Sequence, residues 1–486
     1  MWLVLGLLVF IGLYLWSLRS ASKFPVPPGP KPLPLLGNIF DLTTKELWLR
    51  VTAWAEQYGE VAFARYGDYS RRQRRLMNRA LGPSAVHTYH PLIETETHAL
   101  LKRILADPQE YLEYIRRYAG GLTLNSVYGY QAHSNDDKFL NLANEAVDLL
   151  SNEIASGGGI WPVDVFPFLR HLPVWLPGTS FKRKAIIWRS KIQESVDIPY
   201  EYVLARRKAG NAGPCFVTTA LEGVQDKGVG DLDVQRAFDI RWTANSMYAG
   251  SLDTTITTVQ FFILAMVLNP EALAKAQKEI DTVVGTARLP EFSDRESLPY
   301  IKCVMNEVLR WGAPVPLGYR KMLRNETIYP DPASFNPDRY LAEVDEVTAK
   351  RRDPRNYVFG FGRRRCPGTN LVESSLWMVI VSMIATLSIS KAKDESGCDI
   401  EPKVSFDNAV FRYAFFPSLA LYGLEAERRL CLKNSDTFQM RYSPKVRASG
   451  QACQTGDGCY RRRYIISIHL GWRLVFYGWF YMIWEV

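Results

Sequence analysis

The sequence predicts a mainly α-helical protein carried on an N-terminal membrane anchor. Three features lead to this prediction. Residues 2–16 read WLVLGLLVFIGLYLW, an apolar run without charge. Residues 84–210 repeat apolar positions at spacings of three and four, the period of an amphipathic helix, and residues 233–268 form one long, mostly apolar helical segment. Residues 61–65 have the composition of a single strand.

Composition bounds the classes of protein to consider. With 486 residues, of which 47% are hydrophobic, the chain suits two or three ordinary domains or one large fold around a cofactor. The net charge of +9 suits nucleic acid, an acidic protein partner or anionic lipid. The basic residues are spread along the chain and no nucleic-acid module is present, which favours the latter two. Seven scattered cysteines without paired metal spacing argue against a disulfide framework and for a reducing compartment.

Residues 1–18 are predicted to form a transmembrane anchor close to the lower length limit for a spanning helix. Arg19 and Lys23 follow the run, which places the body in the cytoplasm by the positive-inside rule. A cleaved signal peptide is the alternative, but no positive charge precedes the run and residues 20–22 fit a cleavage site poorly. Residues 19–38, with PVPPGPKPLP at 25–34, are predicted to be a stiff proline-rich hinge.

Residues 359–368 read FGFGRRRCPG and place one cysteine among glycines and arginines. The segment matches F-x-x-G-x-R-x-C-x-G and resembles the haem-binding loop of the cytochrome P450 family. A thiolate from Cys366 would donate electrons to haem iron as its axial ligand, and glycines let a backbone approach a flat macrocycle. The matching residues, which are the predicted cofactor-binding residues of the loop, are Phe359, Gly362, Arg364, Cys366 and Gly368. Arg364 would pair with a haem propionate and Phe359 would shield the sulfur. The alternative is a basic turn with a structural cysteine.

A second motif lies within the long apolar segment, where residues 250–255 read GSLDTT. It resembles the family's A/G-G-x-D/E-T-T/S, which implies that Thr254 hydrogen-bonds bound dioxygen and that Asp253 relays protons as the second catalytic residue. Alone, the motif also suits a threonine bonded back to its own helix beside a capping aspartate. Ser251 stands where the family's second glycine usually lies, and we expect it to narrow the groove left for oxygen.

Three charged residues are predicted to form a structural network. Glu307 and Arg310 lie three apart on one helix face, and Pro337–Tyr340 follows as P-D-R-Y. Their order before the cysteine loop resembles the family's E-x-x-R and P-x-R-x pair, which implies a buried network of Glu307, Arg310 and Arg339. Upstream, Asn269 with Pro270 predicts a capped helix start, and Ser293 to Glu296 predicts a capping box.

Two further segments have two readings each. In the helix that begins near Gly67, Arg74 aligns with the propionate-binding arginine of the family's W-x-x-x-R, but Ser70 replaces the tryptophan and the run of arginines also suits a solvated helix face. Residues 163–178, VDVFPFLRHLPVWLPG, are either a segment that dips into the membrane or caps the substrate entrance, or an ordinary hydrophobic loop.

The sequence departs from the family's pattern in three places. The connections after Arg65 and after Tyr319 are too short for the segments that family members carry there, and residues 421–486 do not resemble the family's end. Either part of the active site is missing, or coding segments were lost and the tail is misread. A second membrane contact is another reading of the aromatic terminus. Residues 39–420 are therefore interpreted as an incomplete haem-thiolate monooxygenase domain, followed by an atypical tail of unknown structure.

The resemblance implies a cytochrome P450 fold, a mainly helical domain with a small β-sheet and with haem b between the Asp253 helix and the Cys366 loop. It implies a monooxygenase of the endoplasmic reticulum membrane that inserts one oxygen atom from O2 into an apolar organic substrate. NADPH would supply electrons through a flavoprotein reductase docked at the basic surface. The sequence most resembles fungal members of the family that act in secondary metabolism or xenobiotic oxidation, including sterigmatocystin-type oxidoreductases. Two alternatives remain: a haem-binding but inactive relative, and a product that binds no haem.

Overall fold

The computed structural model describes residues 68–149, 167–222, 234–314, 322–391, 396, 398–402 and 424–425. The predicted anchor and hinge, the strand at 61–65 and nearly all of the tail lie outside these ranges. The first part of the 163–178 segment lies outside them too. Within the described ranges the protein is mainly helical, as predicted, with a single short strand pair.

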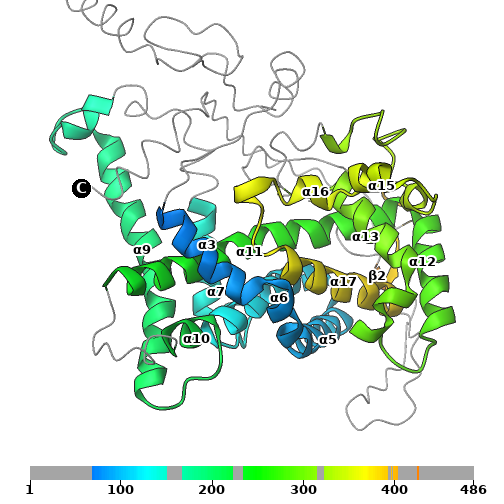
Figure 1. Ribbon diagram of the computed structural model, residues 1–486, viewed down its shortest axis with the longest axis horizontal. Coiled ribbons are helices and arrows are strands. Elements are labelled where there is room, and N and C mark those ends of the chain that lie inside the picture. Colours follow the sequence, from blue (N-terminus) through cyan, green and yellow to red (C-terminus); the bar gives the residue numbers. More distant parts are fainter. Residues whose placement is uncertain are drawn as a thin grey trace, which may run out of the picture.

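The helices follow one another closely along the chain (Figure 1). The helices that precede residue 234 are α3 (Asp68–Leu81), α4 (Pro83–Val86), α5 (His90–Ala106), α6 (Tyr111–Tyr128), α7 (Lys138–Asp148), α9 (Ser180–Lys208) and α10 (Phe216–Glu222). The helices that follow residue 268 are α12 (Pro270–Val283), α13 (Pro299–Trp311), α15 (Glu346–Arg352), α16 (Arg355–Val358) and α17 (Thr369–Thr386). Short 3-10 turns are η2 (His87–Tyr89), η3 (Pro108–Glu110), η5 (Pro167–His171), η7 (Phe292–Ser297), η8 (Pro337–Tyr340) and η9 (Gly362–Arg364).

The fold is organised around α11 (Val234–Leu268), a helix of 35 residues. It runs through the middle of the molecule from α9 at one end to α12 at the other and contacts α3, α6, α13 and α17 on the way (Figure 1). Both α11 and α17 are long and apolar enough to cross a membrane, yet 78% and 72% of their most apolar stretches are buried inside the protein. They are therefore core helices, because a helix that is apolar on all sides is buried wherever it lies.

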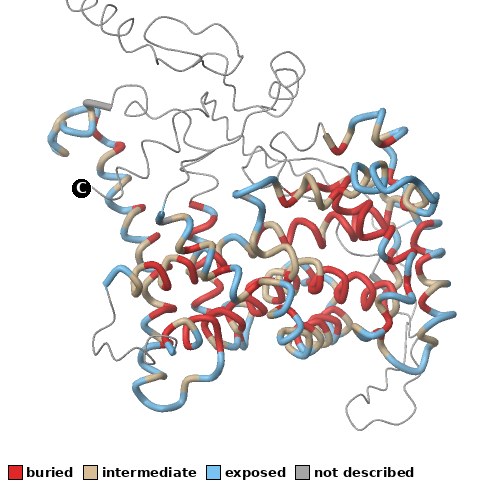
Figure 2. The backbone as a smooth tube through the Cα atoms, viewed as in Figure 1, coloured by how far each residue is buried: buried red, intermediate tan, exposed pale blue. Residues whose placement is uncertain are grey.

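Buried side chains concentrate along α6, α11, α13 and α17 (Figure 2). These helices share one continuous apolar cluster, which is the usual arrangement of a single domain core. A close helix contact is visible at Gly312, where an added Cβ would lie 2.4 Å from the Phe261 ring of α11. The glycine that ends α13 therefore also lets α13 approach α11.

The helix start predicted at Asn269 and Pro270 is confirmed in position, but its side-chain cap does not form, and one predicted capping box is displaced. Asn269 does precede α12, but its side-chain amide donates to the carbonyl of Ala265 at 2.8 Å and caps nothing. The predicted capping box of Ser293 and Glu296 is wrong, since the box is made by Glu291 and Asp294 at the start of η7. The box therefore lies two residues before the predicted position.

The strand pair joins β1 (Ser388–Ile389) to β2 (Leu424–Glu425) in antiparallel fashion. Ser388 pairs with Glu425 and Ile389 with Leu424. The pair places residues 424–425 next to the end of α17.

Candidate functional site

The cysteine loop is a closed backbone turn between α16 and α17. The Cys366 N–H donates to the carbonyl of Phe359 at 2.7 Å and closes the loop, while the Phe359 side chain is buried. Gly360 and Gly362 have φ angles of 74° and 53°, which residues other than glycine rarely adopt. The turn that presents Cys366 therefore requires glycine at these two positions, of which Gly362 belongs to the motif.

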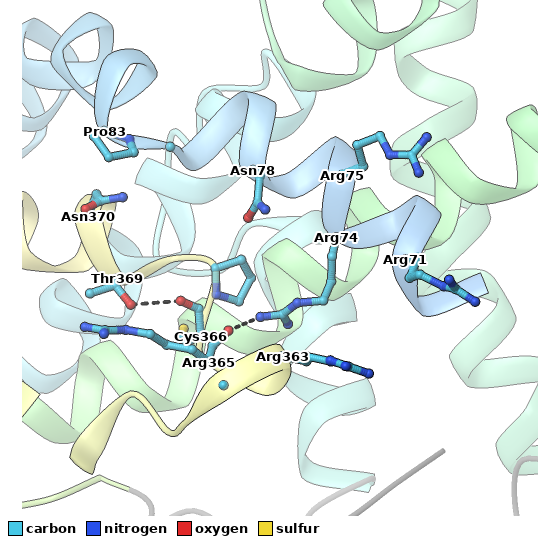
Figure 3. Close-up of a pocket in the computed structure, with 13 residues that line it drawn as sticks. Arg71, Arg74, Arg75, Asn78, Pro83, Arg363, Arg365, Cys366, Thr369 and Asn370 are labelled. Atoms are coloured by element: carbon cyan, nitrogen blue, oxygen red, sulfur yellow. Dashed lines mark hydrogen bonds between the residues drawn. The ribbon is translucent and has the colours of Figure 1, made fainter. Parts of the chain in front are cut away.

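Cys366 lines a cavity of about 800 Å³ between this loop and α3 (Figure 3). This volume lies within the range of about 300–1,000 Å³ typical of small-molecule and cofactor sites. Its walls carry many cations and few apolar groups. The arginines around it are Arg71, Arg74, Arg75, Arg363 and Arg365. Such a rim favours a ligand that carries anionic groups.

Opposing effects act on the Cys366 thiol, which is partly exposed at the cavity. Withdrawal from water raises its pKa, whereas the N–H of Gly368 and the charges of Arg74 and Arg365 act to lower it. The net shift is upward. The donors around the sulfur are those that stabilise a thiolate, and a bound metal ion would supply the additional positive charge that deprotonates a coordinating thiol.

Arg74 extends from α3 to the cysteine loop, where its guanidinium donates to the carbonyl of Arg365, whereas Arg75 points away from it (Figure 3). The structure thus places Arg74 beside Cys366 and not on a purely solvated face. The Arg364 side chain is outside the described part of the chain. Gly368 precedes α17, and a Cβ there would lie 3.7 Å from the Cys366 sulfur, an ordinary contact.

Asp253 and Thr254 lie near the middle of α11. Asp253 is buried, and the Thr254 hydroxyl donates to the carbonyl of Gly250 at 2.9 Å. Thr254 is thus bonded back to its own helix, as in the plainer of the two readings, while Asp253 lies within the helix and caps nothing. Neither residue is among the described residues that line the cavity at Cys366. The face of α11 beside Gly250 is open among the described residues, since none of them lies within 4 Å of a Cβ built there.

The Ser251 side chain does not enter the open space beside Gly250. Its hydroxyl lies 2.7 Å from that of Thr123 on α6 and donates to the carbonyl of Tyr248 at 2.9 Å. The serine that replaces the family's second glycine therefore ties α11 to α6. The expectation that it narrows an oxygen groove rested on the residue type alone and finds no support in this placement.

We expect Ser251→Ala and Thr123→Val each to lower the free energy of unfolding by about 1 kcal/mol, the net worth of one hydrogen bond. The double variant should cost less than the sum, because both changes remove the same contact. Denaturant unfolding of the four proteins measures this coupling. Strictly additive losses would mean that the two hydroxyls do not interact.

Glu307, Arg310 and Arg339 are brought together in one network. Arg310 donates to both carboxylate oxygens of Glu307 at 2.7 Å, and Arg339 donates to one of them at 3.1 Å. The side chains of Glu307 and Arg310 are fully buried. Burial alone would lower the pKa of Arg310, but its bonds to Glu307 reverse this, so its pKa is raised.

The network connects to the loop through a short chain of contacts. Arg310 stacks over the Tyr329 ring at 5.4 Å, and the Tyr329 hydroxyl donates to the carbonyl of Arg352 at 3.2 Å. Arg352 ends α15 just before α16, and Arg355 of α16 bonds Glu373 of α17 at 3.2 Å. The charged residues thus fix the segment that leads into Phe359.

Sequence reasoning missed two residues that hold the cavity walls. The Thr369 hydroxyl donates to the carbonyl of Cys366 at 2.8 Å, and the Asn370 amide donates to the carbonyl of Leu81, at the end of α3, at 3.1 Å. Polar residues in the first turn of a helix often bond to nearby backbone groups, which was the available signal at Thr369. Nothing local to Asn370 indicates α3 as its partner.

The residues at this cavity fit a haem group. Cys366 supplies a sulfur ligand among thiolate-stabilising donors, and the cationic rim suits two propionates. The fit rests on the chemistry of the donor set together with the backbone turn that exposes the sulfur.

Comparison with known proteins agrees with this geometry. A family model described as Cytochrome P450 matches residues 59–323 and 318–412. The chain is 35% identical to cytochrome P450 monooxygenase claT of Ampulloclitocybe clavipes, over 84% of this chain and 93% of the relative. It is 32% identical to cytochrome P450 monooxygenase CLM2 of Gibberella zeae, over 86% and 93%. It is 31% identical to cytochrome P450 monooxygenase 176 of Postia placenta, over 82% and 90%.

Proposed function

The chain belongs to the cytochrome P450 family and is a haem-dependent monooxygenase, and we propose that it inserts one oxygen atom from O2 into an apolar organic substrate. Cys366 at the wall of the cavity is the observation that carries this assignment, because a cysteine sulfur there matches the thiolate ligand of the family's haem. The family generally needs a redox partner. In this protein the electrons would come from NADPH through a flavoprotein reductase.

The proposal gives each loop residue a role. Cys366 would be the axial ligand, and Arg74 and Arg364 would pair with propionates. Gly362 would allow the turn. Gly368, at the start of α17, would keep a side chain away from the sulfur. The buried Phe359 would keep water from the sulfur and, through its carbonyl, hold the Cys366 N–H at 2.7 Å.

Haem, when bound, supplies the oxygen activation, and the protein supplies position and protons. Asp253 and Thr254 would act in this second part. The Thr254 hydroxyl donates to the Gly250 carbonyl at 2.9 Å beside the open face of α11, so a modest side-chain rotation would direct it into that space. The buried Asp253 would then replenish the proton at Thr254 Oγ1.

The relatives are fungal monooxygenases, which supports a fungal microsomal enzyme of the sterigmatocystin type acting in secondary metabolism. The two segments matched by the family model meet at residues 318–323, where the second shortened connection was noted. This supports the view that a segment is missing there, in a domain of residues 39–420 between the hinge and the tail.

We propose an endoplasmic reticulum location with residues 1–18 as a single-pass anchor and the body in the cytoplasm. Exposed apolar side chains between η5 and the middle of α9 support a second contact with lipid. Trp175 is 77% exposed, and Ile186 and Ile187 are 51% and 58% exposed beside the cations Lys182 and Arg183. Such a surface lies favourably at an anionic membrane interface.

A fluorophore attached through Ile187→Cys in the full chain tests this contact. In phospholipid vesicles we expect quenching by a quencher carried on the lipid, because α9 would lie against the bilayer. Val283→Cys on α12 is the matched control, since its site is also exposed but belongs to another part of the fold. Equal quenching at the two positions would contradict the proposed orientation.

The carbon monoxide difference spectrum of the reduced protein tests the proposed function. A strongly red-shifted Soret band is expected, because thiolate ligation from Cys366 produces it. Retained haem without NADPH-dependent oxidation of any substrate by the reconstituted reductase system would favour an inactive relative. Absence of haem from the purified chain would overturn the assignment of the site.

A further inference from the structure

A partly buried ion pair ties α3 to α11. Arg72 Nε donates to Asp239 Oδ2 at 2.5 Å, and its terminal nitrogen lies 3.4 Å from Oδ1. Gln235, one turn earlier on α11, donates to Oδ1 at 3.1 Å. The Asp239 side chain is 5% exposed, and that of Arg72 is 39% exposed. A buried carboxylate is costly unless it is paired, so this position is specific for a cation on α3.

The position of this pair matters because of what α3 carries. Arg72 and Arg74 are two residues apart, so their side chains leave the helix in nearly opposite directions. Arg72 reaches α11, and Arg74 reaches the carbonyl of Arg365 next to Cys366. The N-terminal half of α3 is thereby held between the central helix and the cysteine loop.

Apolar packing holds the other half of α3. Among its described side chains, the buried apolar ones are Met77 and Leu81, both toward the C-terminal end, and Asn370 bonds the Leu81 carbonyl there. Ser70 is too small to brace the N-terminal half. The ion pair therefore adds a specific contact in the half of α3 that has no buried apolar residue among the described side chains.

We propose that Arg72 and Asp239 are positioning residues that keep Arg74 at the cysteine loop and thereby slow the loss of haem from the cavity. Neither residue lines the cavity, so both act through α3. The inference rests on the proposed haem site at Cys366 and adds to it a control of cofactor retention by a remote ion pair.

Transfer of haem from the holoprotein to an excess of apomyoglobin tests this proposal. Asp239→Asn and Arg72→Gln are each expected to speed transfer by about tenfold, the lower end of the effect of residues that orient a metal's ligands. The double variant should be no faster than either single variant, because all three lack the same contact. Arg74→Gln should show a similar acceleration.

The Arg241–Asp197 pair is a matched control. It also joins α11 to another helix, at 2.8 Å, with side chains 34% and 26% exposed, but it lies between α11 and α9. Asp197→Asn is expected to change the transfer rate by no more than about twofold, because this pair holds α9 and leaves the contacts of α3 with α11 and with the cysteine loop in place. Wild-type rates in Arg72→Gln, or an equal acceleration in Asp197→Asn, would overturn the proposal. A wild-type chain without haem would overturn the proposed function as well, which separates the two failures.

Discussion

Replacement of Cys366 by alanine is expected to abolish the red-shifted carbon monoxide band completely. The variant lacks the sulfur ligand, while the loop is closed by backbone groups of Phe359 and Cys366 that remain. Since loss of an outer partner already costs about 10–100-fold in metal affinity, loss of the ligand should weaken haem binding by more than about a hundredfold. Equilibrium titration of the apoprotein with haem and the reduced difference spectrum measure both effects.

Cys398→Ser is the control for this experiment, because Cys398 is also an exposed cysteine but lies beyond α17. It should retain full haem affinity and the red-shifted band. Cys366→Ser offers a smaller perturbation that keeps a hydrogen-bonding side chain. If either Cys366 variant kept the red-shifted band, another residue would have to be the ligand and the cavity between α3 and the loop would not be the haem site.

The local motifs predicted more of the site than of its surroundings. The turn at residues 359–368 follows from its own glycines, because Gly360 and Gly362 adopt φ angles that their sequence permits. The pairing of Glu307 with Arg310 follows likewise from their spacing of three on one helix. Both depend on backbone geometry within a few residues, which sequence patterns describe well.

Contacts between distant segments could not be predicted in this way. The Ser251–Thr123 contact joins residues 128 positions apart, and the Arg72–Asp239 pair joins residues 167 apart. Each residue taken alone suits a helix surface. Their roles depend on the packing of α11 against α6 and α3, which is set by the whole core and leaves no local signal.

Replacement of Glu307 by alanine is expected to lower the free energy of unfolding by about 3–5 kcal/mol. The fully buried Arg310 guanidinium would lose its counter-ion, and the Asn336 N–H would lose an acceptor at 2.8 Å. Arg310 also donates to the carbonyls of Leu323, Pro332 and Ser334, so it cannot turn toward water without breaking three further bonds. Because a folded domain is stable by only about 5–15 kcal/mol, this loss is a large share of the total.

The partly exposed Arg116–Glu113 pair in α6 provides the comparison. It has the same residue types at the same spacing, with an N–O distance of 3.0 Å and side chains 28% and 43% exposed. Glu113→Ala should cost no more than about 0.5 kcal/mol, because water screens the pair and solvates the remaining charge. Urea unfolding of the haem-bound proteins, followed by the Soret band and by circular dichroism, measures the difference.

The Soret band and the circular dichroism signal should also be lost at different urea concentrations. The Glu307 network acts on the cysteine loop through Tyr329, Arg352 and α16, so weakening it should release haem before the helices unfold. In Glu307→Gln, which keeps the shape of the side chain but removes its charge, we expect the Soret midpoint to fall further than the circular dichroism midpoint. Coincident midpoints would show that the network stabilises the fold as a whole and does not specifically stabilise the cysteine loop. A stability loss equal to that of Glu113→Ala would instead mean that Arg310 finds water or another partner once the carboxylate is gone.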